Sequence, residues 1–267
     1  MTSLTTQPYF DVHAHLADET FSADLEECLR VASSCGVMAV ACCASGDADW
    51  ADVEALARRE WPLTIVPCFG LHPWAVAQAQ ENWLDKLEAV LRRWPDAPVG
   101  EIGLDRWKEP VDRGAQECAF RAQWTLAATL GRVAVIHCVQ AWGWLEEVLD
   151  DLPPLERFVL HAYGGPAEMV ESLARRGAWF SFAGNVLRET HLRAQTALQA
   201  VPQDRLLVET DAPDIAPPRR FCRVASRSEP ANIPAVLAGM AAVRGEDPGA
   251  LAKQVYKNSC RVFPVIS

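Results

Sequence analysis

The chain has 267 residues, half of them hydrophobic and 22% charged, which is the composition of a globular protein and excludes a disordered one. Its formal net charge of −10 argues against broad, nonspecific binding to nucleic acid, because such binding depends on a positive surface. The opening residues, MTSLTTQPYFDV, lack the basic and apolar regions of a secretory signal, and the longest apolar stretch, VMAVACCA, is too short to cross a bilayer. We therefore expect a soluble, cytoplasmic protein with no membrane partner.

Eight short apolar runs follow one another along the chain, each with the length and flanks of a buried parallel strand. They lie at residues 9–15, 37–43, 65–71, 98–104, 133–138, 157–163, 178–184 and 206–212. The segments between them are mostly amphipathic, and in the first of these Ser22 can cap a helix and Gly36 can end it. Strand and helix repeated eight times predict an α/β fold, a (β/α)8 TIM barrel. Because no linker or low-complexity tract interrupts the pattern, we expect residues 1–267 to form a single domain, closed by helices between Asn232 and Phe263.

Five of the six histidines lie at or next to the end of an apolar run. They are His13 and His15 in FDVHAHL, His72 in VPCFGLHP, His137 in VAVIHC and His161 in FVLHAYGG. Similarly placed carboxylates are Glu101 in VGEIGLD and Glu209 and Asp211 in LLVETDAP. Because the C-terminal ends of parallel barrel strands share one face, we expect these side chains to gather into a metal site. The sixth histidine, His191, lies in a helical pattern, and we expect it at the surface.

Side chains alternate along a strand, so Asp11, His13 and His15 are expected to point the same way. The two imidazoles can then bind one metal ion, an arrangement that suits a borderline-soft ion such as zinc. The same alternation places Glu209 and Asp211 on one side of the last strand.

The nine cysteines are an odd number without any C-x-x-C spacing, which argues against both a disulfide framework and a cysteine-ligated zinc site. A buried free thiol behaves as a small hydrophobic side chain, and we expect that role here. Five cysteines lie in or beside apolar runs or loops: Cys42, Cys43, Cys68, Cys138 and Cys222. Cys138 directly follows His137, so it could be a neighbour of the site.

The basic residues are mostly arginines, and a cluster of them follows the last predicted strand: Arg219, Arg220, Arg223 and Arg227. An arginine can bind a phosphate through two parallel hydrogen bonds. Two interpretations of this cluster stay open, a phosphate-binding loop and a solvated surface loop.

Six short motifs occur in register along the chain: DVHAHL, GLHP, GEIGLD, IHC, HAYGG and ETDAP. With them the chain resembles the TatD-like deoxyribonuclease family of the amidohydrolase superfamily, over nearly its whole length. The resemblance implies a (β/α)8 barrel that carries one to three divalent metal ions. It also implies hydrolysis of phosphodiester bonds in DNA, which some members perform from the 3′ end.

The resemblance further implies which residues bind metal. One ion is held by His13, His15 and Asp211, and a second by His137 and His161, with Glu101 as the bridge between them. Such a bridge is also expected on physical grounds, because two cations a short distance apart repel one another and need an anion between them. Asp211 could also accept a proton from the attacking water. We therefore expect two divalent ions, which could be Mg²⁺, Mn²⁺ or Zn²⁺. We expect the catalytic residues to be Asp211, Glu101 and His72.

Other residues have less direct roles. His72, on the loop after the third strand, could contact the scissile phosphate or protonate the leaving oxygen, or it could cap the local backbone. Glu209 and Asp105 are better interpreted as carboxylates that orient the imidazoles of metal ligands.

Two loops over the expected site depart from the family pattern: RWKEP after the fourth strand and DIAPPRRFCRVASRSEPANIP after the eighth. Loops at this end of a barrel determine substrate choice. Arg106, Trp107, Arg219 and Arg220 could grip phosphates of DNA and stack on its bases, or they could shape a pocket for another phosphorylated molecule.

The sequence as a whole favours a divalent-metal-dependent phosphodiesterase, a deoxyribonuclease that could act as a 3′–5′ exonuclease, with DNA or another phosphodiester as its partner. A related hydrolase of a lactone, an amide or an aminoacyl ester is one alternative, and a noncatalytic barrel is another. The glutamate bridge and the arginine-rich loop favour phosphodiester hydrolysis over the first alternative. The complete set of ligands argues against the second.

Overall fold

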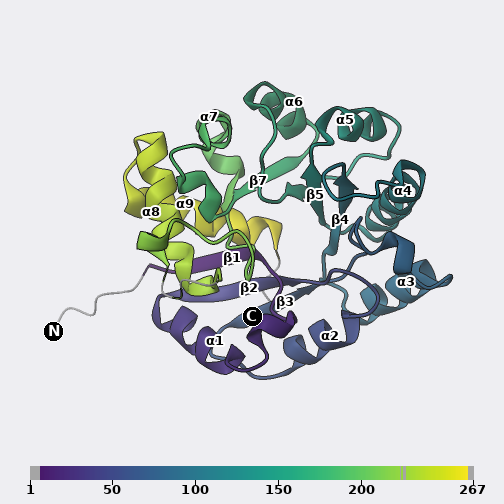
Figure 1. Cartoon of the computed structure of the whole chain (residues 1–267), viewed down its shortest axis with the longest axis horizontal. Coiled ribbons are helices and arrows are strands. Elements are labelled where there is room, and N and C mark those ends of the chain that lie inside the picture. The colour runs from purple at the N-terminus through teal and green to yellow at the C-terminus, as the bar shows by residue number, and fades with distance from the viewer. Residues whose placement is uncertain (1–6, 223, 225–226, 264–267) are drawn as a thin grey trace.

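The computed structural model describes residues 7–222, 224 and 227–263, in which eight strands form a ring with helices packed around it (Figure 1). The strands are β1 (Tyr9–Ala14), β2 (Val37–Cys43), β3 (Thr64–Cys68), β4 (Val99–Asp105), β5 (Ala134–Val139), β6 (Phe158–Leu160), β7 (Ala178–Phe182) and β8 (Leu206–Val208). Each strand lies within or across one of the eight apolar runs, so the predicted α/β alternation is confirmed.

All strand pairs are parallel and follow the order of the chain. One sheet joins β1, β2 and β3, and a second joins β4 to β8. Single parallel bridges connect the two sheets, from Phe69 to Val99 and from Ala14 to Ala212. These two bridges complete the circle of strands that a barrel requires.

The strands β3, β6, β7 and β8 end earlier than the apolar pattern predicts, and two of them, β6 and β8, have only three residues. The sixth ends at Leu160 and the eighth at Val208, although the apolar character continues beyond both. The backbone turns away at Ala162 and Asp211, whose φ angles are 42° and 51° and therefore incompatible with an extended strand. As a consequence, several of the polar residues expected on these strands lie directly after them.

The helices fill the connections and close the ring. The α-helices are α1 (Leu25–Ser34), α2 (Trp50–Arg58), α3 (Trp83–Arg93), α4 (Arg113–Leu130), α5 (Trp142–Asp150), α6 (Val170–Arg175), α7 (Leu192–Ala200), α8 (Ile233–Arg244) and α9 (Pro248–Val262). Short 3-10 helices are η1 (Glu19–Phe21), η2 (Val76–Gln78), η3 (Ala167–Met169), η4 (Gly184–Leu187), η5 (Gln203–Arg205), η6 (Arg219–Phe221) and η7 (Pro230–Asn232). The last two α-helices occupy the segment in which closing helices were expected. Within the described part of the chain, no helix combines the length and the apolar character needed to span a membrane.

The start of the first α-helix differs from the prediction. Ser22 is the C-cap of η1, and α1 begins after Asp24 instead. The expected role of Gly36 fits better, since it follows the C-cap Cys35 with a φ of 92°. A Cβ atom at Gly36 would lie 2.6 Å from the carbonyl oxygen of Gln7, so only glycine fits this turn.

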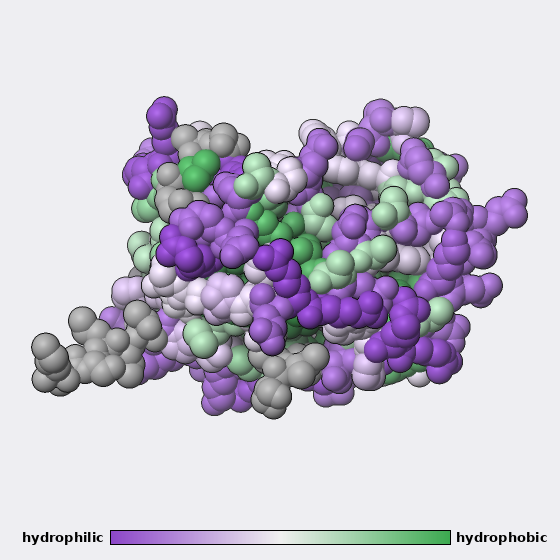
Figure 2. Space-filling view, turned by 90° about the horizontal axis from the view of Figure 1, so that it is seen from below, coloured by the Kyte–Doolittle hydropathy of each residue, from purple (hydrophilic) through white to green (hydrophobic). Residues whose placement is uncertain are grey.

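The apolar residues form an outer and an inner core. The outer core lies between strands and helices, and the side view in Figure 2 shows polar residues predominating over the surface outside it. The inner core takes alternate strand residues such as Ala39, Ala41 and Cys43, together with Phe263 after α9, whose ring centre lies 5.6 Å from that of Phe10. Phe263 thus fills the end of the ring where the strands begin and leaves the other end for polar side chains.

Two buried glutamines of α4 hold the loops at that other end. Gln116 accepts a hydrogen bond from the backbone N–H of Asp105 (2.8 Å). Gln123, which is fully buried, accepts one from the N–H of Leu71 (2.7 Å) and donates to the carbonyl of the same residue (3.1 Å). Because Leu71 precedes His72, the amide of Gln123 fixes the loop that carries this histidine.

We therefore expect Gln123→Leu to lower the free energy of unfolding by about 1–3 kcal/mol, since it leaves two buried backbone groups of Leu71 without their bonds. Urea denaturation measures the loss. The control is Gln199→Leu, whose amide bonds the carbonyl of Val243 at the surface, where water can replace it. Equal stability losses in the two variants would contradict the role assigned to Gln123.

Candidate metal centre

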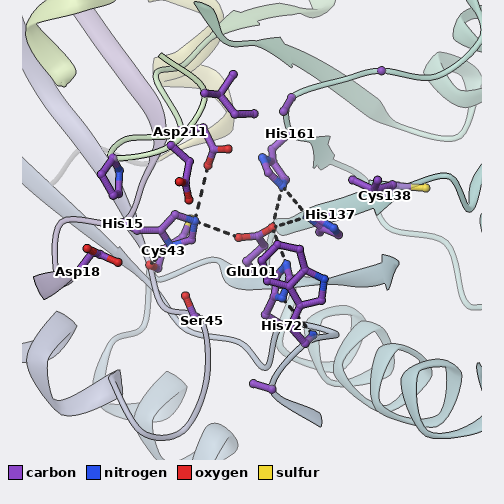
Figure 3. Close-up of a pocket in the computed structure, with 18 of the residues that line it drawn as sticks. His15, Asp18, Cys43, Ser45, His72, Glu101, His137, Cys138, His161 and Asp211 are labelled. Atoms are coloured by element: carbon purple, nitrogen blue, oxygen red, sulfur yellow. Dashed lines mark hydrogen bonds and ion pairs between the residues drawn. The ribbon is translucent and has the colours of Figure 1, made fainter. Parts of the chain in front are cut away.

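A pocket of about 850 Å³ opens at the end of the ring where the strands finish. Each of the eight strands, or the loop directly after it, contributes to its lining (Figure 3). One residue from each, in chain order, is His15, Cys43, His72, Glu101, His137, His161, Asn185 and Asp211. The convergence of the strand ends therefore brings together polar side chains that are far apart in the sequence.

The carboxylate of Glu101 lies at the centre of this group and is only 2% exposed. Its Oε2 atom is 3.3 Å from Nε2 of His13 and 3.3 Å from Nε2 of His15. Asp211 approaches the same two nitrogens, with its Oδ1 atom 3.4 and 3.6 Å away. These four side chains form one half of the site.

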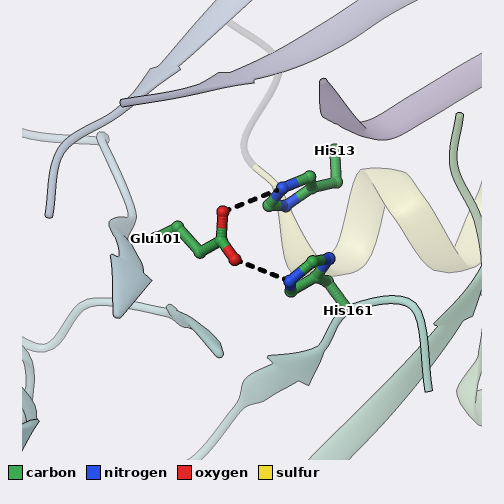
Figure 4. Close-up of side chains that lie close together, drawn as sticks. All are labelled: His13, Glu101 and His161. Carbon is green, nitrogen blue, oxygen red and sulfur yellow. Dashed lines mark ion pairs between the residues drawn. The ribbon is translucent and has the colours of Figure 1, made fainter. Parts of the chain in front are cut away.

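The other oxygen of Glu101 faces a second group of imidazoles. Its Oε1 atom is 2.7 Å from Nε2 of His161, 3.0 Å from Nδ1 of His137 and 3.3 Å from Nε2 of His72. The rings of His13 and His161 stack 4.0 Å apart, and Figure 4 shows them on the same side of the carboxylate, one at each oxygen. Glu101 therefore joins two groups of ligands, one at each of its oxygens.

In His15 and His137, the hydrogen bond made by the outer nitrogen of the imidazole determines whether the inner nitrogen, which faces Glu101, carries a proton. Nδ1 of His15 bonds to the backbone carbonyl of Cys43 (3.0 Å), and Nε2 of His137 bonds to the carboxylate of Asp105 (2.7 Å). Both partners are acceptors, so in a neutral ring the proton lies on the outer nitrogen and the inner nitrogen carries a lone pair. Nδ1 of His161 lies 3.6 Å from Glu209, which is too far for a hydrogen bond, so the tautomer of this ring is not defined in the same way.

Lone pairs that face carboxylate oxygens require a cation between them. Three groups of side chains have ligand atoms close enough for this: His13, His15 and Asp211; His13, Glu101 and His161; and His72, Glu101 and His137. Imidazole nitrogen with carboxylate oxygen is a donor set that Zn²⁺, Mn²⁺ and related divalent ions accept. The residues present therefore fit a metal centre of more than one ion.

The groups around the two buried carboxylates, Glu101 and Asp105, also determine whether these carboxylates are ionised. Burial alone would raise the pKa of Glu101, but the imidazoles of His161, His72 and His13 hold that pKa well below its usual range. For Asp105 burial also acts upward, but hydrogen bonds from His137 and from the backbone of Lys108 bring its pKa down to about 2. Both carboxylates are therefore ionised near neutral pH.

His72 differs from the other imidazoles in its tautomer. Its Nδ1 atom accepts a hydrogen bond from the backbone N–H of Trp74 (3.1 Å), so in a neutral ring the proton lies on Nε2, which faces Glu101. Burial lowers the pKa of His72 to about 4, against the opposing charge of Glu101, so the ring is neutral at physiological pH. His72 is thus a hydrogen-bond donor at the site rather than a lone-pair ligand, although it belongs to one of the three groups above.

Comparison with known proteins agrees with this geometry. The family model of TatD related DNases matches residues 10–264. The chain belongs to this family. A relative described as a 3′-5′ ssDNA/RNA exonuclease TatD, from Erwinia tasmaniensis, is 31% identical over 95% of this chain and 99% of the relative.

Solved structures support the same assignment. YJJV, a TatD homolog from Escherichia coli K12, superposes with a TM-score of 0.87 at 26% identity, over 97% of this chain and 98% of the homolog. A TatD family hydrolase from Entamoeba histolytica gives a TM-score of 0.86 at 21% identity, over 97% of this chain and 98% of its own, and shares the fold. The predicted TIM-barrel type of fold and the TatD resemblance are therefore confirmed.

Other sequence expectations have mixed outcomes at this TatD family site. Glu209 lies 3.6 Å from Nδ1 of His161 and accepts hydrogen bonds from the N–H of Ala162 (2.6 Å) and from the hydroxyl of Ser181, and its role in orienting that imidazole stays a prediction. Asp11 does not face Glu101 with His13. It binds the backbone and hydroxyl of Thr210 instead, and the register of β1 is irregular between Asp11 and Ala14, so strict alternation does not hold there.

The arginine-rich loop also differs from the expectation. Arg227 is buried and bonds to Asp24 (2.6 Å) and Glu229 (2.9 Å), so for this residue both interpretations, phosphate binding and a solvated surface loop, are wrong. Arg219 and Arg220 are exposed but do not line the pocket, and their contact with substrate stays a prediction. Arg223 lies outside the described residues.

Of the remaining candidates, Cys138 is the one among the residues that line the pocket. Arg106 and Trp107 are exposed on the loop after β4, and Cys138 lines the pocket as a free, buried thiol. His191 is the N-cap of α7 and belongs to none of the three ligand groups.

Three of the pocket side chains that were not predicted from the sequence bear on the function of the site: Cys43, Trp74 and Arg193. Cys43 has its Sγ atom 3.4 Å from Nδ1 of His13, besides its carbonyl on His15. Trp74 and Arg193 line the pocket from the loop after β3 and from the start of α7. The position of Cys43 at the end of a strand could have indicated its role, since that signal identified the histidines.

We expect Asp105→Asn to lower the affinity for a divalent ion roughly 10–100-fold, the usual effect of losing the partner of a metal-bound histidine. The new amide group would donate to Nε2 of His137 and force the proton onto Nδ1, the nitrogen that faces Glu101. Calorimetric titration of metal-free protein with Mn²⁺ measures this affinity. Asp112→Asn, at the exposed cap of α4, is the control, and equal affinities would contradict the assignment.

Proposed function

We propose that this TatD family protein is a divalent-metal-dependent nuclease that removes nucleotides from the 3′ end of single-stranded DNA. The observation that carries the proposal is the buried carboxylate of Glu101 between two groups of imidazoles. Its relatives are described as exonucleases of single-stranded DNA and RNA, which supports this substrate class.

Two divalent ions, Mg²⁺, Mn²⁺ or Zn²⁺, would be held by the ligands that the geometry brings together. His13, His15 and Asp211 would hold one ion and His137 and His161 the other, with Glu101 between them. When bound, such ions stabilise the charge that develops on the phosphate oxygens and make water a stronger nucleophile.

Asp211 is placed to accept the proton of the attacking water. Burial would raise the pKa of Asp211, but the neighbouring imidazoles of His15 and His13 lower it, so the carboxylate is ionised. Its backbone N–H donates to the carbonyl of His13 (2.9 Å), which fixes a residue with a φ of 51°. The oxygen that would take the proton is therefore held in a single place.

His72 would act on the other side of the scissile bond. Its neutral ring carries a proton on Nε2, as argued above, and its Nδ1 atom is fixed by Trp74. It can donate a hydrogen bond to a phosphate oxygen or to the leaving oxygen. A neutral donor suits this position because it does not compete with cations for the carboxylate of Glu101.

Positive charge at the rim of the pocket would attract the DNA to these residues. Arg193 lines the pocket and is exposed, and no ion pair of its guanidinium is found among residues 7–222, 224 and 227–263. It can therefore bind a phosphate without breaking an internal contact. We assign phosphate binding first to Arg193, and to Arg219 and Arg220 only outside the pocket.

Metal removal tests the first part of the proposal. We expect a chelator to abolish hydrolysis of single-stranded DNA, because it removes the ions that activate water and stabilise the charge on the phosphate. We expect Mg²⁺, Mn²⁺ or Zn²⁺ to restore the activity. The release of nucleotides from an end-labelled oligonucleotide measures activity. A panel with a lactone, an amide and an aminoacyl ester shows whether another bond is the substrate, and cleavage that survives full metal removal would refute the metal-dependent mechanism.

The site assignment is tested by two substitutions. Glu101→Gln should reduce kcat by several orders of magnitude, since it removes the charge between the two ligand groups, whereas His191→Ala should leave kcat nearly unchanged. Circular dichroism of both variants checks that they are folded. If both variants lost activity to the same extent, the centre would lie elsewhere in the molecule.

A further inference from the structure

Two tryptophans expose their rings at the rim of the pocket. Trp74 is 40% exposed and lines the pocket, and Trp107 is 61% exposed beside it, with the two ring centres 6.1 Å apart and the planes inclined by 37°. Within the described part of the chain only Met38 and Leu192 are comparably exposed large apolar side chains. Exposed apolar rings gathered at a pocket indicate a surface that contacts a ligand.

Both tryptophans are fixed to the metal centre through their backbones. The N–H of Trp74 donates to Nδ1 of His72 (3.1 Å), and the N–H of Trp107 donates to Oδ1 of Asp105 (2.7 Å). The other oxygen of Asp105 holds His137. The backbone that carries each ring is therefore tied to the metal centre, and a flat group resting on the rings would lie close to that centre.

Lysine and arginine side chains add positive charge next to these rings. The ammonium group of Lys108 lies 4.1 Å from the centre of the Trp74 ring, which leaves the Trp107 ring as the more open face. Arg193 follows β7, and Trp74 follows β3. These two strands are four apart in a ring of eight, so the arginine and the tryptophan reach the lining of the pocket from opposite sides of the ring. An aromatic face with cations on two sides matches a base with its flanking phosphates.

We propose that Trp107, supported by Trp74, stacks on one unpaired base of the substrate strand while Lys108 and Arg193 bind phosphates on either side of it. This inference rests on the proposed function and specifies how the substrate is selected. Every base has an aromatic face, so such a platform tolerates any base. A base inside a duplex cannot reach it. The enzyme would thus require an unpaired base at one fixed position and have little preference for sequence.

The test replaces single bases of an oligonucleotide by abasic sugars, one position at a time from the 3′ end. Binding of phosphorothioate-linked versions to metal-loaded protein is measured by fluorescence anisotropy, and KM is measured with ordinary linkages. For the unmodified protein, loss of the base at one position should raise Kd and KM about ten-fold, the effect of one base–aromatic stack. Losses at other positions should have smaller effects.

The variants identify the ring responsible. In Trp107→Ala the oligonucleotides with and without that base should bind equally, whereas Trp107→Phe should keep most of the difference. Trp74→Ala should reduce the difference in part. Lys108→Gln should weaken the salt dependence of binding but keep the preference for the base. Met38→Ala, an exposed apolar residue near the start of β2, is the control and should match the unmodified protein.

The outcomes separate this inference from the nuclease assignment. If Trp107→Ala kept the full difference between base and abasic sugar, the stacking platform would be refuted, even with DNA cleavage intact. If base-dependent binding were lost in Trp107→Ala but no oligonucleotide were cleaved by the unmodified protein, the platform would stand and the nuclease assignment would fail.

Discussion

The burial of one carboxylate, that of Glu101, is the constraint on which the rest of the site depends. Removing a carboxylate from water costs roughly several kcal/mol even after the surroundings relax, so it needs cations or hydrogen-bond donors around it, together with the side chains that hold them. Five imidazole nitrogens lie within 3.3 Å of its two oxygens. So many side chains can meet only where many chain segments converge, and in this fold that is the end of the ring where the strands finish.

The convergence of the strands alone does not determine where the ligand side chains lie. The backbone conformation directly after the strands also positions them. Ala162 and Asp211 have positive φ angles, which cost free energy in residues other than glycine. Their N–H groups bond to Glu209 and to the carbonyl of His13. The bonds that hold the unfavourable backbone are therefore bonds to members of the site, so that the turn and the ligand geometry stabilise one another.

The two contributions, strand convergence and the backbone after the strands, explain what could be predicted from the sequence. The strands and their terminal histidines could be predicted because both depend on short apolar runs and on the next one or two residues. The early ends of β6 and β8 could not, since a positive φ at Asp211 leaves no mark in the apolar pattern. Arg227 was misplaced because its partner Asp24 lies 203 residues earlier in the chain. The pairing of Trp74 with Trp107 likewise exists only once β3 and β4 are side by side.

Charge balance connects the metal centre with substrate binding. Among the described residues that line the pocket, five carboxylates (Asp18, Asp49, Glu101, Asp211 and Asp214) stand against one guanidinium, that of Arg193, which gives a charge of −4 with neutral histidines. A phosphodiester strand would be repelled by such a pocket, the more so on a chain with a net charge of −10. Two divalent ions carry a charge of +4 and cancel the excess. The same ions that the chemistry needs are thus needed for the strand to enter, and the cations at the rim can attract phosphate effectively only when the centre behind them is filled.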